Sequence, residues 1–505
     1  IQYGSTVEEI VEHLGFRNNG LYTNEWLIGD AKTNQIAMFE LGTHKTKLYR
    51  SSRNEWFGGT EGFYWGCNNA KDLNVRLEYA PDPQGRPAHL PFVPSDRDIK
   101  WQALYDTWKG RIDEQFGFLA FRTAPLVSAT SMDAKITTAE MASRLMMWAV
   151  FGKPNQREWV PTRWETENFP HITGIYSSGY RLFQAESVAP KGQSRSAEPE
   201  KIEDPKKSPY TDKLWKGWIL PATDADVWLT AGSAAYYAAL SSDEPEKAVD
   251  SHRASFRAAA LVEDRPLSKI AADIRSRQGH RLAANKGVLL LDALRREMGD
   301  ADFLSLMTRF FERNTTKPVA AADFLKEAGR PMQMWIDDAG LPDSSTGPAY
   351  VASHLTERLG NALLVYGTVA DAGANRRAAE LLQLKFLDWH ESLTPIRKDF
   401  EVSEAEMRSR DVVFVGRPET NSALAGMGLD FEGAAFRIDG ADHSSESEAL
   451  LLAGANPLDR KRMVLVVAGN SALETVRLAS AAPLDQWEYA IYDAGKRKAY
   501  GFRKR

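Results

Sequence analysis

The chain has 505 residues, of which 43% are hydrophobic and 26% charged, and its formal net charge is −5. This length exceeds what one hydrophobic core supports, so two to four domains are expected. The small net charge argues against nucleic acid as a partner and against strong electrostatic attachment to a membrane. No apolar run is long enough to predict a transmembrane segment. A single cysteine excludes an intrachain disulfide and a cysteine-based metal cluster.

The first 51 residues predict a short helix followed by three strands. Ser5 and Glu8 form a capping-box sequence ahead of an apolar stretch, which predicts the helix. Lys32-Thr33-Asn34 has the composition of a tight turn, so the strands on either side of it should form a hairpin. The strands are expected at residues 25–31, 35–42 and 45–51.

An aromatic sequence follows at residues 62–66, GFYWG, and is expected to be a further strand. It ends at Cys67-Asn68-Asn69. Two adjacent amide side chains directly after an aromatic strand favour a functional site over a surface turn.

Residues 79–96 contain five prolines and predict a loop. A helix that begins after Thr138 should end at Gly152-Lys153-Pro154. Residues 186–212 are rich in Pro, Ser, Lys and Glu, which is typical of a linker. The remaining expected elements are a helix at 99–115, a strand at 116–122, a strand or turn at 132–136 and a helix at 139–151.

The second half changes character twice. Residues 213–345 have helical spacing of Ala and Leu throughout, and the rest alternates short apolar runs with helical stretches such as 376–386. The apolar runs at 362–366, 411–415 and 462–468 lack polar alternation, which predicts buried parallel strands in a small α/β layer. We therefore expect an α+β multidomain chain with domains at 1–185, 213–345 and 346–505, joined by a linker at 186–212.

The order of features in residues 20–160 resembles the penicillin acyltransferase-like branch of the N-terminal nucleophile (Ntn) hydrolases, and also phospholipase B-like proteins. The pieces that match are Asp30, Glu40, Cys67-Asn68-Asn69, Ser128-Ala129-Thr130 with Asp133, and Gly152-Lys153-Pro154. The resemblance implies a four-layer αββα sandwich, autoproteolysis that exposes an N-terminal cysteine, and attack on an amide or ester bond. It also implies a periplasmic or secreted protein that needs no cofactor.

By this resemblance, Asn68, beside Asn69, would donate its amide to the oxyanion of a tetrahedral intermediate; the alternative is an asparagine that caps a strand end. The family has an arginine just before its S-A-T strand, where this chain has Val127, so Arg122 is the nearest candidate and a simple salt bridge is its alternative. Cys67 is a candidate nucleophile or an inert buried thiol.

The family's nucleophile is the first residue of the mature chain, and Ile1 cannot take that role. We therefore expect the nucleophilic cysteine on an upstream chain or segment. The substrate is expected to be a small molecule or a peptide with an amide or ester bond. The aromatic candidates to line its acyl pocket, with core packing as the alternative for each, are Trp26, Phe57, Tyr64 and Trp65.

A second resemblance lies in the helical region. The sequence from Trp228 to Tyr236, WLTAGSAAY, is similar to the gluzincin aminopeptidase helix W-L-x-E-G-x-A-x-Y, and the stretch from Lys286-Gly287 resembles the helix that follows it. The glutamate that would be the third zinc ligand is Ala231 here, and the chain has no H-E-x-x-H motif. No metal site is expected, and the region is interpreted as a relic scaffold.

The chain also lacks a G-x-S-x-G elbow and a phosphate-binding G-x-x-x-x-G-K-[ST] loop. Two hypotheses remain. The first is an Ntn-type hydrolase or acyltransferase. The second is a catalytically inactive, peptidase-derived binding or scaffold protein.

Overall fold

A computed structural model describes residues 4–18, 20, 24–76, 78, 93–127, 131–161, 163–185, 219–271, 273, 275–314, 317–342, 347, 349–390, 392–425, 431–432, 435–481 and 484–503. The chain divides into two compact units, residues 1–214 and 215–505, which we treat separately. The linker expected at 186–212 and the Ser128-Ala129-Thr130 strand lie outside the described residues. None of the described helices combines the length and apolar character needed to cross a membrane.

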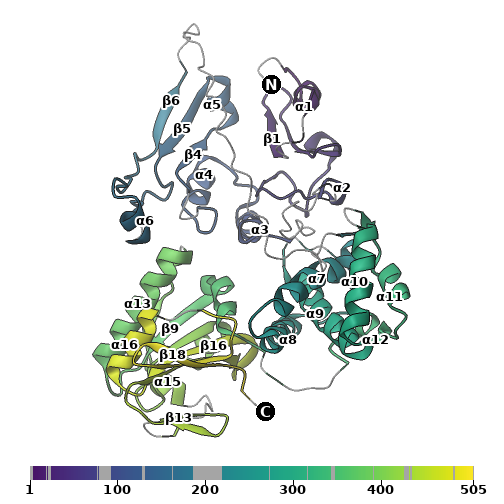
Figure 1. The fold of residues 1–505 in the computed structure, drawn as a ribbon. Coiled ribbons are helices and arrows are strands. Elements are labelled where there is room, and N and C mark those ends of the chain that lie inside the picture. The colour runs from purple at the N-terminus through teal and green to yellow at the C-terminus, as the bar shows by residue number, and fades with distance from the viewer. Residues whose placement is uncertain are drawn as a thin grey trace. The chain divides into compact units, whose positions relative to one another are not determined.

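The first unit begins with helix α1 (Val7–Gly15), which is labelled with strand β1 in Figure 1. Strand β1 belongs to an antiparallel sheet in the order β1-β2-β3. The helix is capped by Thr6 rather than Ser5, because the Thr6 hydroxyl accepts from the Glu9 N–H while Ser5 binds the Glu9 carboxylate. The predicted hairpin and third strand are confirmed. Their bounds are β1 (Asn24–Asp30), β2 (Gln35–Leu41) and β3 (Thr46–Arg50), followed by the short 3₁₀ helix η1 (Ser51–Arg53).

The prediction of a strand at residues 62–66 was wrong. This segment is irregular, and its aromatic side chains pack as a cluster instead of pairing in a sheet. Phe63 stacks on Tyr105 and meets the edge of Phe116, and Trp65 lies beside Phe57. Aromatic residues favour strands only because they fit half-buried surfaces, and this cluster satisfies that requirement without a ladder. The flanking helices are α2 (Leu73–Arg76) and α3 (Asp96–Trp108), where the helix at 99–115 was predicted.

A second three-stranded antiparallel sheet, in the order β4-β5-β6, completes the described part of this unit. The strand predicted at 116–122 is instead a helix, because Asp113 caps it through the Phe116 N–H. The helix predicted at 139–151 ends early, where Leu145 takes a positive φ and the chain turns into a strand that pairs on both sides. The elements are α4 (Glu114–Ala120), β4 (Asp133–Ile136), α5 (Ala139–Ser143), β5 (Met146–Phe151), α6 (Arg163–Asn168) and β6 (Arg181–Gln184).

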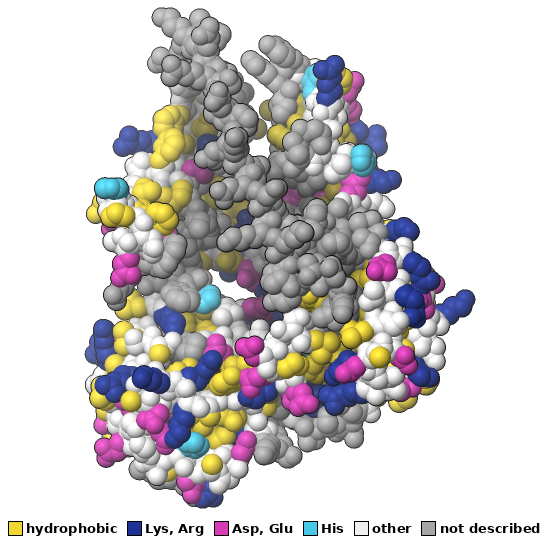
Figure 2. Space-filling model, viewed as in Figure 1, with side chains coloured by type: hydrophobic (Ala, Val, Ile, Leu, Met, Phe, Trp, Pro, Cys, Tyr) yellow, Lys and Arg dark blue, Asp and Glu magenta, His cyan; other side chains and the backbone are white. Residues whose placement is uncertain are grey.

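The paired strands β5 and β6 expose apolar side chains to solvent. Phe151 is 64% exposed, Leu182 47% and Phe183 43%. Figure 2 shows hydrophobic side chains at the surface in the region of β5 and β6. The predicted mixture of α and β structure is confirmed. The two sheets of the unit are not hydrogen-bonded to each other, and the four-layer Ntn-type sandwich stays a prediction.

The second unit opens with the helices predicted from the spacing of Ala and Leu. Helices α7 (Val227–Leu240) and α9 (Gln278–Met298) approach closely where Gly232 faces Gly287, since a Cβ on Gly287 would lie 2.2 Å from the Trp228 carbonyl oxygen. The other elements are β7 (Leu220–Pro221), η2 (Asp224–Asp226), α8 (Pro245–Val262), η3 (Leu267–Lys269), α10 (Asp300–Asn314), β8 (Pro318–Val319), α11 (Ala321–Ala328) and α12 (Gln333–Asp337).

The rest of this unit contains a seven-stranded mixed sheet in the order β10-β9-β11-β16-β15-β17-β18 and a separate three-stranded sheet in the order β12-β13-β14. The predicted buried strands are confirmed: β9 (Ala362–Tyr366), β11 (Asp411–Val415) and β16 (Asp459–Gly469) pair in parallel and have apolar side chains on both faces. The remaining elements are η4 (Ala352–Glu357), η5 (Leu359–Asn361), α13 (Ala372–His390), β10 (Ile396–Lys398), α14 (Glu404–Ser409), α15 (Ser422–Ala425), β12 (Phe431–Glu432), β13 (Ala435–Ile438), β14 (Ala441–His443), β15 (Glu448–Asn456), α16 (Ala472–Ala481), β17 (Tyr489–Asp493) and β18 (Lys496–Gly501).

The loop after β11 folds back over the carboxyl ends of β9 and β11. The Asn421 amide donates to the carbonyl oxygens of Val365 (3.0 Å) and Val415 (3.1 Å). A Cβ on Gly367 would lie 2.2 Å from the Thr420 carbonyl oxygen, which shows how closely this loop approaches the end of β9. Asn421 is fully buried, so it closes the gap between the two strand ends.

Candidate functional site

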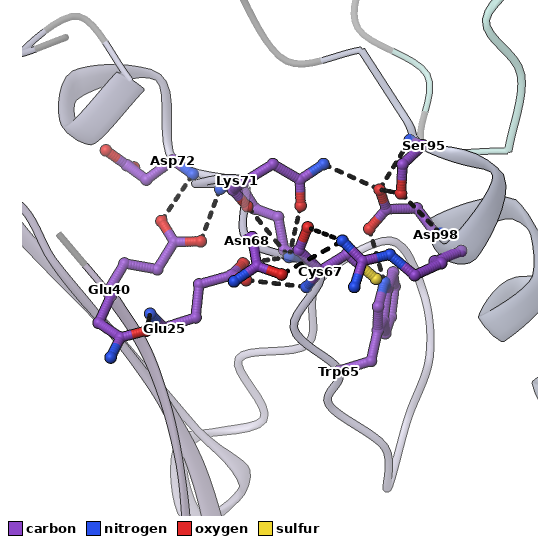
Figure 3. A network of polar contacts seen from close by, with 12 residues as sticks. Glu25, Glu40, Trp65, Cys67, Asn68, Lys71, Asp72, Ser95 and Asp98 are labelled. Atoms are coloured by element: carbon purple, nitrogen blue, oxygen red, sulfur yellow. Dashed lines mark hydrogen bonds and ion pairs between the residues drawn. The ribbon is translucent and has the colours of Figure 1, made fainter. Parts of the chain in front are cut away.

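A buried polar network surrounds Cys67-Asn68-Asn69 in the first unit (Figure 3). Its central charge is Lys71, whose side chain has no exposed surface and forms an ion pair with Glu25 of β1. The other oxygen of Glu25 accepts from the Cys67 N–H at 2.9 Å. Glu40 of β2 accepts from the backbone N–H groups of Lys71 (2.6 Å) and Asp72 (2.8 Å). The first sheet thereby fixes the chain that carries the two asparagines.

Asp98 in the first turn of α3 holds the other side of the network. Its carboxylate accepts from the indole of Trp65 (3.0 Å), from the Asn69 amide (2.8 Å) and from the hydroxyl of Ser95 (2.7 Å). Burial opposes ionisation of Asp98, but the positive Lys71 and these hydrogen bonds outweigh it and lower the pKa of the carboxyl. Asp98 is therefore ionised and joins the aromatic segment to the helix.

Asn68 is the exposed member of the predicted tripeptide. It adopts the left-handed backbone conformation with φ of 61°, which asparagine tolerates better than most residues other than glycine, and Asn34 and Asn54 of the same unit adopt it too. Arg97 donates to the Asn68 Oδ1 at 3.2 Å and to the Cys67 carbonyl oxygen at 3.0 Å. This contact fixes the orientation of the amide, and the Asn68 Nδ2 makes no hydrogen bond within the described part of the chain. The amide therefore presents an oriented donor at the surface.

Cys67 has the opposite environment. Its thiol is buried, and burial, with the nearby carboxylate of Asp98, raises the pKa to about 12. A thiol with this pKa is almost entirely protonated at neutral pH, and the thiolate is the reactive form. The local electrostatics thus favour an inert structural cysteine over a nucleophile.

This environment predicts that Cys67 resists alkylation. Relative to a thiol at its usual pKa of 9.0, a pKa of about 12 reduces the thiolate fraction at pH 8 by about a thousandfold. Native protein treated with iodoacetamide at pH 8 should remain unmodified by mass spectrometry, whereas the guanidinium-unfolded chain should take up one label. Rapid stoichiometric labelling of the native protein would contradict this environment.

The aromatic candidates are placed differently from one another. Trp65 is 2% exposed and Tyr64 is 9% exposed, and both use their polar atoms internally, because the Tyr64 hydroxyl donates to the Glu55 carbonyl oxygen at 2.6 Å. Phe57 lies against Trp65 and Tyr49. Trp26, which is half-buried, pairs with Phe39 across the β1–β2 ladder. Tyr64 and Trp65 are core residues.

Among the described residues, Arg122 makes no contact with Asn68 or Asn69. Its guanidinium lies 5.9 Å from the centroid of the Tyr180 ring, and Tyr180 meets the edge of Phe118 of α4. Asp30, at the end of β1, is a turn residue whose carboxylate accepts from the Lys32 N–H and the Thr33 hydroxyl.

Sequence reasoning missed the charged residues that position Asn68. Loops separate Lys71, Arg97 and Asp98 from the strands of the first sheet. Of the acidic residues in the network, the sequence pointed only to Glu40, through the Ntn resemblance. Pairing in the β1–β2 ladder places Glu25 opposite Glu40, and two acidic side chains that share one face of a sheet require a nearby cation. That pairing was the signal available in the sequence.

Ala231 is 3% exposed and lies inside α7, where the gluzincin helix has a glutamate. The Tyr236 hydroxyl donates to Asp292 at 2.8 Å and accepts from Arg295 at 2.6 Å. These hydrogen bonds join α7 to α9. The described residues of the chain include no group of three or more His, Cys, Asp or Glu side chains suited to a metal ion.

Comparison with known proteins found no matching family model and no matching curated protein. Similarity was found to crystal structures of a two-domain M1 zinc metallopeptidase, a glutamate-to-alanine mutant bound to L-tryptophan in one case and to L-arginine in another. The identities are 27% and 26%, and each match has a TM-score of 0.21 and covers 25% of this chain. This chain spans about 30% of the length of that peptidase.

Proposed function

We propose that the protein is a hydrolase or acyltransferase of the Ntn type, which attacks an amide or ester carbonyl with Asn68 as an oxyanion donor. The observation that carries the proposal is the oriented amide: Arg97 holds the Asn68 Oδ1, and this leaves the Nδ2 at the surface. A fixed neutral donor aimed at developing negative charge is what stabilises a tetrahedral intermediate.

The proposed nucleophile is not Cys67, since its buried thiol is held in the protonated form. We propose that an upstream segment or a second chain supplies the thiol, as the Ntn resemblance implies. The buried network of Glu25, Lys71 and Asp98 then has a positioning role, because it fixes the backbone on either side of Asn68.

The test is the effect of Asn68→Ala on turnover of a p-nitrophenyl acyl ester and a p-nitroanilide by the full-length protein purified from its source. We expect kcat to fall about a hundredfold, the loss typical of one oxyanion donor. Asn74→Ala is the matched control, because Asn74 is an exposed asparagine a few residues along the same unit. A variant lacking the Asn68 amide that retained full kcat would remove the proposed role.

The alternative function is a catalytically inactive, peptidase-derived binding or scaffold protein. The specific observation in its favour is Ala231, which is buried in α7 at the position where the gluzincin helix carries its glutamate ligand. Absence of turnover, together with absence of labelling by a thiol-directed acyl probe in the full-length material, is the result expected for this alternative.

A further inference from the structure

A cavity of about 220 Å³ lies in the second unit, where residues of α8, α9 and η4 line it together. Its volume is about seven times the ~30 Å³ that a water molecule occupies in the liquid, so it has room for a small organic molecule. The helices and the mixed sheet belong to one packed body here, because Ala258 of α8 is part of the hydrophobic core of the sheet. The cavity is therefore a feature of a single folded unit.

Ser251 of α8 lines the cavity with a hydroxyl group that is ready for a ligand. Its side chain is buried, with the residue only 6% exposed, and the hydroxyl makes no hydrogen bond within the described part of the chain. Buried polar groups usually have partners, because burial removes the hydrogen bonds that water supplied. A serine hydroxyl both donates and accepts, so a bound molecule could satisfy it in either way.

His252, the next residue of α8, offers an acceptor to the cavity. The Asn285 Nδ2 donates to the Arg281 carbonyl oxygen at 2.8 Å, so the Asn285 Oδ1 is the atom that faces His252 Nδ1 at 2.8 Å. That oxygen can only accept, so Nδ1 carries the proton. Burial lowers the pKa of His252, which keeps the ring neutral. The His252 Nε2 is therefore an acceptor, and no donor reaches it from the described residues.

Ser255, one helical turn further, offers a donor. The Val351 N–H donates to His354 Nδ1 at 3.3 Å, so the proton of that ring is on Nε2, which lies 3.0 Å from the Ser255 hydroxyl oxygen. Burial, followed by the positive charges of nearby arginines, lowers the pKa of His354 to about 3. His354 therefore donates to Ser255 and cannot take its proton, so the two are not a nucleophile and its base. The Ser255 hydroxyl keeps its own proton for another acceptor.

The charged side chains that line the cavity are paired with one another or with the sheet. Arg281 forms an ion pair with Glu357, and Arg358 binds Asp411 at 3.1 Å and the Lys461 carbonyl oxygen at 3.3 Å. The lining thus has charges of both signs, each with a partner. The hydrogen-bonding groups that remain for a ligand are the uncharged ones of α8.

We propose that this cavity binds a small uncharged molecule that carries several hydroxyl groups. One ligand hydroxyl donates to His252 Nε2, and a second accepts from the Ser255 hydroxyl. These two residues are three positions apart on α8 and so are neighbours on one face of the helix, within reach of hydroxyl groups on adjacent carbons. A carboxylate could only accept and an ammonium group could only donate, whereas a hydroxyl does both. This site is independent of the function proposed for Asn68.

The probe is xylitol, titrated into the full chain and followed by saturation-transfer NMR. Pentane-1,5-diol is the matched compound, because it has the same carbon chain without the inner hydroxyl groups. Binding is measured directly, since polyols also stabilise folded proteins without a specific site. We expect saturable xylitol binding, about tenfold or more weaker binding of the diol, and no displacement of xylitol by inorganic phosphate.

Two substitutions remove one hydrogen bond each and should weaken xylitol binding by about threefold to tenfold. Ser251→Ala removes the buried hydroxyl. His252→Asn provides an amide that can still donate to the Asn285 Oδ1 but leaves no acceptor in the place of Nε2. Ser305→Ala, the same serine change at an exposed position of α10, should bind as the wild type does.

Thermal unfolding by circular dichroism checks that each variant is folded, and Ser251→Ala provides the test if His252→Asn is not, because alanine is the best helix former. Four results would overturn the proposal: no saturable xylitol binding, equal affinity for xylitol and the diol, displacement of xylitol by phosphate, or wild-type xylitol affinity in every folded cavity variant.

Discussion

Replacing Lys71 with methionine is expected to lower the free energy of unfolding of the first unit by about 3–5 kcal/mol, the usual cost of removing one partner of a buried ion pair. The Lys71 side chain has no exposed surface, and its partner Glu25 is 7% exposed. Methionine matches the length of the lysine stem but leaves Glu25 buried without a cation. The same change removes the positive charge that lowers the pKa of Asp98. The carboxylates of Glu25 and Asp98 therefore both lose the positive charge that stabilises them.

Urea unfolding followed by tryptophan fluorescence measures this loss, since Trp65 donates to Asp98 within the network. Lys135→Met is the matched control in the same unit. Lys135 is 58% exposed and pairs with an equally exposed Asp133, an arrangement that contributes about 0–1 kcal/mol. If the two lysine variants unfolded at the same urea concentration, the buried pair would not have the energetic role described here.

Gly287→Ala should destabilise the second unit by about 3 kcal/mol, at the upper end of what overpacking costs. A Cβ at this position would lie 2.2 Å from the Trp228 carbonyl oxygen and 3.1 Å from the Gly232 Cα. Both obstacles are backbone atoms of α7, so no side-chain rotation relieves the overlap and the two helices must separate.

The control for this substitution is Gly279→Ala, which makes the same change on the same helix. There the new methyl group would meet its nearest neighbour, the Ala271 carbonyl oxygen, at 3.4 Å, which is an ordinary contact. Alanine favours a helix over glycine by about 0.8–1.0 kcal/mol, so this variant should melt at the same temperature as the wild type or slightly higher. Thermal unfolding at 222 nm that ranked the two variants the other way would contradict the close contact of α7 and α9.

The sequence predicted best where one physical signal dominated. The apolar runs at 362–366 and 411–415 form parallel strands with the predicted bounds. Strands of a parallel sheet are buried on both faces, and apolar side chains at every position satisfy that burial. The run at 116–122 became a helix, because a short apolar stretch fits either structure and the Asp113 cap decided between them. At residues 62–66, packing against α3 replaced strand pairing.

The candidate site was predictable only in part. Adjacent amides after an aromatic segment pointed to Asn68, but its orientation depends on Arg97, which lies beyond a proline-rich loop. The long-range partners of the buried network are 29 to 46 residues apart in sequence. Contacts at such separations follow from how the sheet and α3 pack together, and no local pattern encodes that packing.

The loop that Asn421 anchors has a consequence for how the mixed sheet is used. The strand order β10-β9-β11-β16 is the arrangement 2-1-3-4, in which α/β proteins customarily bind cofactors in the crevice between the first and third strands. Here the Asn421 amide occupies that crevice and bonds to the carbonyl oxygens of both strands. The space directly between the ends of these two strands is therefore filled by a side chain of the protein itself, which ties the loop after β11 to both strands.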